Sequence, residues 1–167
     1  MAMQTDFTFI AEPVSDEQID DMYEAGMDLN VSGHDGLTFV LATVAGVDPV
    51  SEALALAARL AITCGVRIQR ADLDLVNQAM IADLCEVSRE AVSQWAAKST
   101  FPLPHTVVRT PLWAWCDVTA WLRQVGRATD DAMPASSQQV EDFNQRWRHT
   151  LATSTAETNL TLQPVAA

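Results

Sequence analysis

The chain has 167 residues, of which 49% are apolar and 19% are charged, and its formal net charge is −12. This composition argues against wholesale disorder and suits one ordinary domain or two small ones. No apolar run approaches the ~20 residues that a membrane-spanning helix needs, and the first residues, MAMQTDFTF, lack the basic and apolar regions of a secretory signal.

The acidic charge is concentrated in the first part of the chain. Residues 1–75 hold 13 acids and three arginines, residues 76–127 hold four acids and five bases, and residues 128–167 hold five acids and two arginines. The net charges of these segments are therefore −10, +1 and −3. Such a contrast indicates modules with different partners.

In chain order, residues 1–74 predict an acidic module of the α+β class. Ser15 and Gln18 form a capping box that starts a helix, and Asp48-Pro49 starts another, which Gly65 ends. The elements expected are strands at 6–11, 28–32, 37–44 and 66–70, a turn at 33–36, and helices after Ser15 and over 49–64. This β-α-β-β-α-β order is that of the ferredoxin-like fold, which hosts many functions.

The sequence contains no recognisable catalytic set, so we expect neither an enzyme nor a cofactor. His34 and Asp35 lie between glycines and are interpreted as turn residues rather than as a catalytic pair. Cys64, Cys85 and Cys116 lie far apart in apolar surroundings. We expect them to be buried free thiols rather than metal ligands, and the protein to be cytoplasmic.

Residues 75–98, LVNQAMIADLCEVSREAVSQWAAK, predict two short helices with almost nothing between them. Asn77 and Ser88 are suitable caps for helices that begin at the following residues. Ala82 is small enough for a close helix crossing, and Val87 can fill the junction between the helices. This combination predicts a helix-turn-helix.

The segment that follows extends this pattern. It contains Phe101-Pro102-Leu103-Pro104, Leu112-Trp113-Ala114-Trp115-Cys116-Asp117-Val118 and Trp121-Leu122. With Ile81-Ala82, Val87-Ser88-Arg89, Val92 and Trp95, residues 76–124 resemble the excisionase-like and MerR-like winged helix-turn-helix DNA-binding proteins. The whole chain also resembles a common type of small bacterial regulator with a ferredoxin-like front half. The resemblance implies a winged helix-turn-helix over 75–125.

We expect wing strands at 105–109 and 112–115, a bend at Thr110-Pro111, and a helix capped by Asp117. Trp113, Trp115 and Trp121 are expected in the core. Glu86 occupies a turn position that is commonly Gly. Since a left-handed conformation costs a non-Gly residue about 1 kcal/mol, we expect a tighter or differently shaped turn and weakened DNA binding.

The resemblance places the second helix, at about 88–98, in the major groove of double-stranded DNA. Arg89 can then pair with guanine, Gln94 with adenine and Glu90 with a cytosine amino group. Lys98 and Arg109 suit phosphates. The DNA-binding residues expected are Ser88, Arg89, Glu90, Ser93, Gln94, Lys98 and Arg109. Because so few bases are present, we expect a homodimer that doubles the contacts.

Residues 126–138 are interpreted as a linker, residues 139–152 as a helix and residues 153–167 as a flexible tail. The helix carries one apolar stripe, formed by Val140, Phe143, Trp147 and Leu151. This stripe either contacts a partner or second copy, or packs within the chain. Leu160 and Leu162 could add an extended strand to a partner.

The sequence therefore predicts a sequence-specific DNA-binding transcriptional regulator. The alternative is an antitoxin or adaptor that binds a protein partner, such as a toxin or another regulator, and represses its own operon. That partner would contact the acidic module or the C-terminal helix. The acidic surface could instead be merely solvated, or keep its module away from DNA phosphates, and the helix-turn-helix could be a scaffold for protein contacts.

Overall fold

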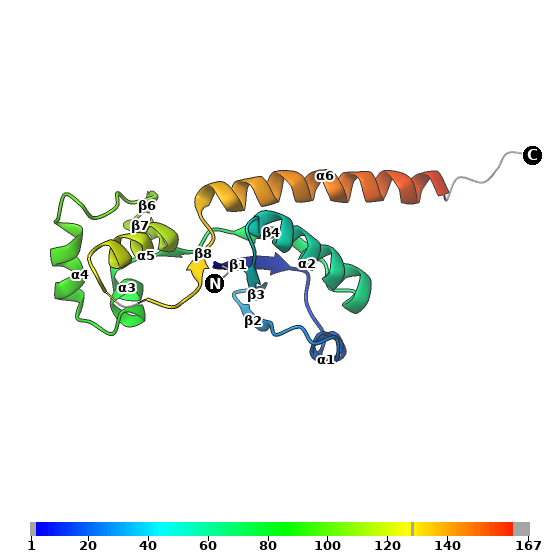
Figure 1. Ribbon diagram of the computed structural model, residues 1–167, viewed down its shortest axis with the longest axis horizontal. Helices are drawn as coiled ribbons and strands as arrows, with labels where there is room; N and C mark the ends of the chain where they lie inside the picture. Colours follow the sequence, from blue (N-terminus) through cyan, green and yellow to red (C-terminus); the bar gives the residue numbers. More distant parts are fainter. Residues whose placement is uncertain (1–2, 128, 162–167) are drawn as a thin grey trace, which may run out of the picture.

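The first unit of the protein is a sheet with helices packed on it. The computed structural model describes residues 3–127 and 129–161 and confirms the α+β class (Figure 1). The elements of this unit are β1 (Gln4–Ala11), α1 (Asp16–Glu24), β2 (Asn30–His34), β3 (Leu37–Ala45), α2 (Pro49–Cys64), β4 (Ile68–Asp72), β8 (Met133–Pro134) and α6 (Ser137–Thr161).

The strands of this sheet lie in the order β2-β3-β1-β4, and each neighbouring pair is antiparallel. Phe9 is central, since it faces Val40 on one side and Ala71 on the other. The short strand β8 pairs in parallel with Thr5 and Asp6 of β1. The N-terminal half of β1 thus has a neighbour contributed by the C-terminal part of the chain.

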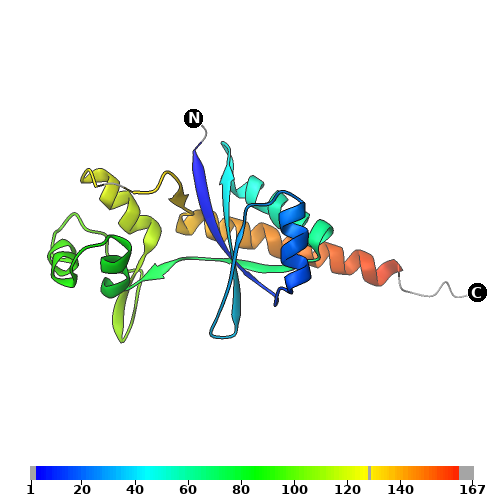
Figure 2. The ribbon, with the colours of Figure 1, turned by 90° about the horizontal axis from the view of Figure 1, so that it is seen from below.

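The core lies on the face of the sheet that α2 and α6 cover, and Figure 2 shows these helices behind the strands. Alternate residues of β1 point into it, because side chains alternate between the two faces of a strand. Phe7 and Phe9 are fully buried there. The ring of Phe143 on α6 lies 6.1 Å from that of Phe7 and 5.1 Å from that of Phe9, measured between centroids.

Helix α6 also closes the outer edge of β4. The Asn144 side chain accepts a hydrogen bond from the Ala71 N–H (2.7 Å) and donates one to the Ala71 carbonyl (2.9 Å). The Trp147 indole donates to the Ile68 carbonyl at 2.8 Å. Side chains therefore satisfy backbone groups that an unpaired edge strand would leave open to another chain.

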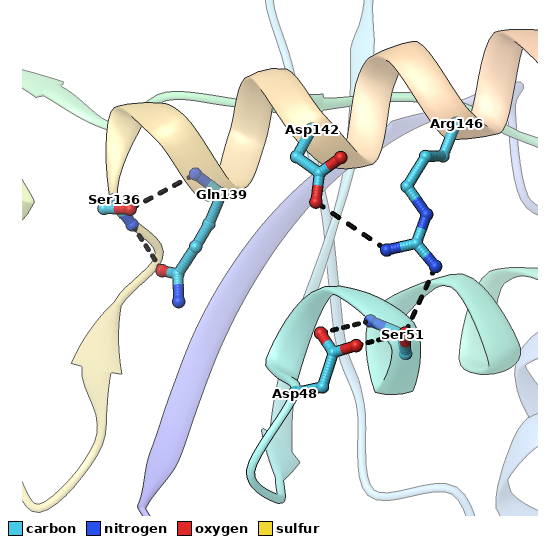
Figure 3. A network of polar contacts seen from close by, with 6 residues as sticks. All are labelled: Asp48, Ser51, Ser136, Gln139, Asp142 and Arg146. Atoms are coloured by element: carbon cyan, nitrogen blue, oxygen red, sulfur yellow. Dashed lines mark hydrogen bonds and ion pairs between the residues drawn. The ribbon is translucent and has the colours of Figure 1, made fainter.

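The first turns of α6 are fixed to α2 by the polar network in Figure 3. Ser136 and Gln139 form a capping box at the start of α6, with hydrogen bonds of 3.2 and 2.8 Å. Arg146 donates to the Ser51 hydroxyl at 3.2 Å and pairs with Asp142 at 3.7 Å. The cap sets where α6 begins, and Arg146 holds it against the start of α2.

The C-terminal part differs from its sequence-based prediction. The segment 126–138, expected to be a linker, contains β8, and the helix expected over 139–152 runs from Ser137 to Thr161. Residues 153–161, expected in a flexible tail, are therefore helical, Leu160 included. Residues 162–167, with Leu162, lie outside the described residues.

The predicted apolar stripe of α6 packs within the chain. Val140, Phe143 and Trp147 are buried in the core of the first unit, so of the two alternatives intramolecular packing is confirmed and the assignment of these residues to a partner or dimer contact is wrong. The physical reason is that this sheet would otherwise expose Phe7 and Phe9. Leu151, the fourth residue of the stripe, lies beyond this core and is 41% exposed.

The second unit comprises β5 (Leu75–Val76), α3 (Gln78–Leu84), α4 (Arg89–Ala96), β6 (Thr106–Val108), β7 (Thr110–Ala114) and α5 (Trp115–Gln124). Its strands lie in the order β5-β7-β6. A separate core holds the unit together, and its members are Val76, Ile81, Ala82, Val92, Trp95, Phe101, Trp113, Val118, Trp121 and Leu122. Trp113 and Trp121 are core residues as expected, while Trp115 is half-buried.

Several local boundaries differ from their predictions. Gly33 and His34 belong to β2, so the turn consists of Asp35 and Gly36, both with positive φ. Arg109, with φ 61°, makes the bend of the β6–β7 hairpin in place of the predicted Thr110-Pro111. Helix α5 begins at Trp115 after Ala114 and has no side-chain cap, so Asp117 lies inside its first turn. Strands β2 and β4 each begin two residues later than predicted.

Asp74 links the two units. Its carbonyl accepts a hydrogen bond from the Trp115 N–H at 2.8 Å, and its carboxylate accepts one from the Thr8 hydroxyl at 3.1 Å. Burial raises the pKa of this carboxyl group, and the neighbouring Asp72 and Asp6 add to that effect while Thr8 opposes it. Asp74 therefore contacts both units at their junction, and Arg123 of α5 adds hydrogen bonds to the Asp130 and Asp131 carbonyls before β8.

Candidate nucleic-acid interface

Helices α3 and α4 form a compact pair with side-chain caps at both starts. The Asn77 side chain accepts from the Met80 N–H at 2.9 Å, and the Ser88 hydroxyl accepts from the Ala91 N–H at 3.1 Å. These are the caps that the sequence predicts. Ala82 on α3 and Val92 on α4 are buried in the shared core, so α4 has a fixed inner face.

The turn between these helices keeps the left-handed conformation. Glu86 has φ 54°, its N–H donates to the Asp83 carbonyl, and the Val87 N–H donates to the Ala82 carbonyl at 3.0 Å. The prediction that Glu86 forces a tighter or differently shaped turn is therefore wrong. The hydrogen bonds and the packing of the two helices impose this backbone, and Glu86 adopts it at a cost.

The outer face of α4 is polar and exposed. Its residues are the ones that the sequence predicts for DNA contact, namely Arg89, Glu90, Ser93 and Gln94, with Ser88 at the cap. The Ser93 hydroxyl donates to the Gln78 side chain at 3.1 Å, which ties this face to α3. Buried Val92 and Trp95 hold α4 from behind, so these polar side chains project away from the core on a rigid element.

The bases of this unit fall into two groups. Arg89, Lys98 and Arg109 are exposed, and none of them takes part in an ion pair among residues 3–127 and 129–161. Lys98 lies with its ammonium 5.9 Å from the Trp121 ring centroid. The other two bases have further partners. Arg127 stacks over Trp95 at 4.4 Å, and Arg123 donates to the Asp130 carbonyl at 2.6 Å. The first three remain available for phosphates or bases.

Arg109 lies at the tip of the hairpin formed by β6 and β7. The same hairpin exposes Val107 and Val108, each at 66%, and Leu103 before it is 85% exposed. Sequence reasoning did not single out these apolar residues. The predicted elements could have indicated their exposure. They include a two-stranded hairpin but no further helix that could cover the outer side of that hairpin.

Three acids lie in α4 or in the residues just before it. Asp83, Glu86 and Glu90 are exposed, so the local field is mixed rather than strongly positive. Cys85 beside them is half-buried, and burial raises the pKa of its thiol. Within the described part of the chain, no group of three metal-binding side chains occurs.

Comparisons with known proteins give no relative for this chain. No protein-family model matches it, and no curated protein and no solved structure matches it significantly. Among the described residues, no helix has both the length and the apolar character needed to cross a membrane.

Proposed function

We propose that the chain is a sequence-specific DNA-binding transcription regulator that acts as a homodimer on double-stranded DNA. The observation that carries the proposal is the polar outer face of α4, held rigidly by Val92 and Trp95. A short helix of this width fits the major groove, where Arg and Gln side chains can distinguish base pairs. Arg89 and Gln94 are the residues assigned to base contact.

We propose further that residues 75–125 form a winged helix-turn-helix and residues 1–74 a ferredoxin-like module. The strand order β5-β7-β6 beside α3 and α4 supports the first assignment. The order β2-β3-β1-β4 with antiparallel neighbours supports the second. In this arrangement Arg109 at the wing tip and Lys98 after α4 contact phosphates flanking the groove.

The dimer follows from the small number of free bases. Each neutralised phosphate contributes salt-dependent affinity, and one copy offers Arg89, Lys98 and Arg109 against the acids beside α4. Two copies on a two-fold site double the favourable contacts at one helical turn of spacing. The proposed operator is therefore a palindrome.

A salt titration of binding to DNA fragments from upstream of the chain's own gene tests the proposal by fluorescence anisotropy. We expect one fragment to bind preferentially, with a loss of about 1–3 kcal/mol of that preference in Arg89→Ala. Arg67→Ala is the matched control, since Arg67 is exposed on the first unit. Equal binding of all fragments by the natural protein and Arg89→Ala would contradict base reading.

The alternative function is an antitoxin or adaptor whose helix-turn-helix represses its own operon. It shares the DNA contacts and differs in requiring a protein partner. If no fragment binds above background at low salt, α3 and α4 are a scaffold for protein contacts.

A further inference from the structure

Helix α1 carries an apolar pair on its solvent side. Ile19 is 40% exposed and Tyr23, one turn later, is 83% exposed. Met22, beside this pair on α1, is buried and anchors the helix. Residues four apart on a helix are neighbours on its surface, so Ile19 and Tyr23 form one short ridge that no other element of the described chain covers.

A groove of about 690 Å³ runs beside this ridge, between α1 and the start of β2. Met22 and Met27 are buried at its base, and Leu29 and Val31 are half-buried along its side. Its lining residues are Ile19, Met22, Tyr23, Glu24, Gly26, Met27, Asp28, Leu29 and Val31. Methionine side chains adapt to different apolar shapes, which suits a surface that accepts another chain.

The rim of the groove is strongly acidic. Residues 12–28 contain seven carboxylates and neither Lys nor Arg. The Arg59 guanidinium, from α2, donates to the Ala25 carbonyl at 3.0 Å and is the basic group held at the end of α1. Glu24 and Asp28 line the groove itself. An apolar strip with such a border is complementary to a segment that is apolar on one side and basic around it.

We propose that this groove is a docking site for a basic amphipathic helix of another protein. Ile19 and Tyr23 would pack against apolar residues spaced three and four apart on that helix, and Lys or Arg beside them would face the carboxylates. A second copy of the chain is a poor occupant, because it would bring the same carboxylates to the same rim. The site does not depend on the proposed DNA binding.

The groove and helix α4 lie on opposite sides of the sheet. Figures 1 and 2 both place α1 away from α3 and α4, with the sheet between them. A partner on α1 therefore leaves α4 accessible. The failure of one proposal can be recognised separately from the failure of the other.

The test is a selection from a display library of 16-residue peptides with all positions randomised, using the whole chain as target. We expect the enriched peptides to be basic and to repeat apolar residues at intervals of three and four. Fluorescence anisotropy with the most enriched peptide should then show about tenfold or more loss of affinity in Tyr23→Ala, as for an interface hot spot. Ile19→Ala should also weaken binding.

Matched variants separate the apolar and the charge contributions. Leu103→Ala, in the second unit, should leave affinity unchanged, since Leu103 is 85% exposed and is not part of the groove lining. The double variant Asp20→Asn with Glu24→Gln should lower affinity and flatten its salt dependence. The double variant Glu141→Gln with Glu157→Gln, which changes two exposed acids of α6, should leave both the affinity and its salt dependence unchanged.

Three results would overturn the proposal. One is enrichment of acidic or non-helical peptides. Another is equal affinity of Tyr23→Ala and the natural protein for the selected peptide. The third is self-association of the protein alone, seen by sedimentation and abolished by Tyr23→Ala, because the occupant would then be a second copy. Unchanged thermal unfolding of the variants excludes misfolding as a cause.

Discussion

Replacing Glu86 by Gly tests how the α3–α4 pair tolerates its unusual turn. Glu86 has φ 54° and an exposed side chain with no side-chain hydrogen bond among the described residues. Its backbone is imposed by the bonds of Glu86 and Val87 to the preceding turn of α3. Removing the Cβ should therefore relieve strain without removing a contact.

The expected gain is about 1 kcal/mol, because a non-Gly residue at positive φ destabilises by roughly this amount even after the freer unfolded chain of Gly is counted. For a chain of this length, that gain corresponds to a rise of about 2–4 °C in the melting temperature. Urea unfolding followed by tryptophan fluorescence reports on the affected unit, whose core contains Trp95, Trp113 and Trp121.

The same substitution removes a carboxylate beside the proposed DNA face. A unit charge about 10 Å from a phosphate is worth about 0.4 kcal/mol in water, or about twofold in affinity at low salt. Glu86→Gln should give this twofold gain in DNA affinity without the gain in stability. Asp35→Gly, at φ 49° in the β2–β3 turn, should raise the free energy of unfolding but leave DNA affinity unchanged. An unchanged or lowered free energy of unfolding in Glu86→Gly would refute the strain argument.

Three further predictions concern the first unit and its junction. Phe143→Ala should cost about 3–5 kcal/mol of unfolding free energy, whereas Leu151→Ala should stay within about 0.5 kcal/mol, because only Phe143 is fully buried; equal costs in urea unfolding would contradict this packing. Asn144→Ala should lower the free energy of unfolding by about 1–3 kcal/mol. It should also speed amide hydrogen exchange at Ala71, because the N–H and carbonyl of Ala71 lose their partner. Unchanged exchange would show that another group protects this edge of β4. Asp74→Asn should raise stability at pH 7, since burial raises the pKa of Asp74 in the folded state, so that ionisation opposes folding as pH rises through that range. The gain should vanish below the unfolded pKa of about 4; a gain that persists in urea titrations at pH 3 would contradict this cause.

Local features of the fold were predictable from the sequence wherever one residue type satisfies a local backbone demand. Ser15, Asn77 and Ser88 cap helices because their side-chain oxygens accept from the first-turn N–H groups. Gly65 ends α2 with φ 64°, a conformation that costs Gly little. The exposed polar residues of α4 were predictable for the same reason. The cap residue fixes where the helix begins, and the helical spacing of the apolar residues then determines which side faces outward.

Long-range pairing was not predictable in this way. Strand β8 exists because the edge of β1 beside Thr5 and Asp6 is open, and nothing in its own residues, Met133 and Pro134, indicates a strand. The β6–β7 hairpin bends at Arg109 because the pairing of Val108 with Thr110 leaves one residue for the reversal. The groove beside α1 was missed for a related reason, because its side is formed by Leu29 and Val31, beyond the helix itself.

The C-terminal end of α6 was missed because its composition is poor for a helix. Threonine loses side-chain freedom in helices and competes for backbone partners. In the last part of α6, four threonine hydroxyl groups instead donate hydrogen bonds of 2.8–3.0 Å to the backbone carbonyl four residues earlier. These bonds run from Thr153 to His149, Thr155 to Leu151, Thr158 to Ser154 and Thr161 to Glu157. Since these hydroxyl groups are satisfied within the helix, the segment continues as a helix where composition predicted a tail.

The charge of −12 and the proposed DNA binding are compatible if the acids lie beyond the reach of the phosphates. A chain of this size spans about 40 Å, and α1 with its carboxylates lies at the end away from α4 (Figure 1). At 0.1 M salt the screening length is about 10 Å, but at 0.01 M it is about 30 Å. DNA affinity should therefore rise as salt falls and then level off below about 0.02 M, where the acidic end begins to repel the duplex. The measurement is a plot of log affinity against log salt for the natural protein and for Asp16→Asn with Asp20→Asn and Glu24→Gln. The plot for the neutralised variant should stay linear over the whole salt range. A linear plot for the natural protein as well would contradict the argument. The carboxylates of α1 would then not affect DNA affinity, and the separation of charge along the chain would have no part in DNA binding.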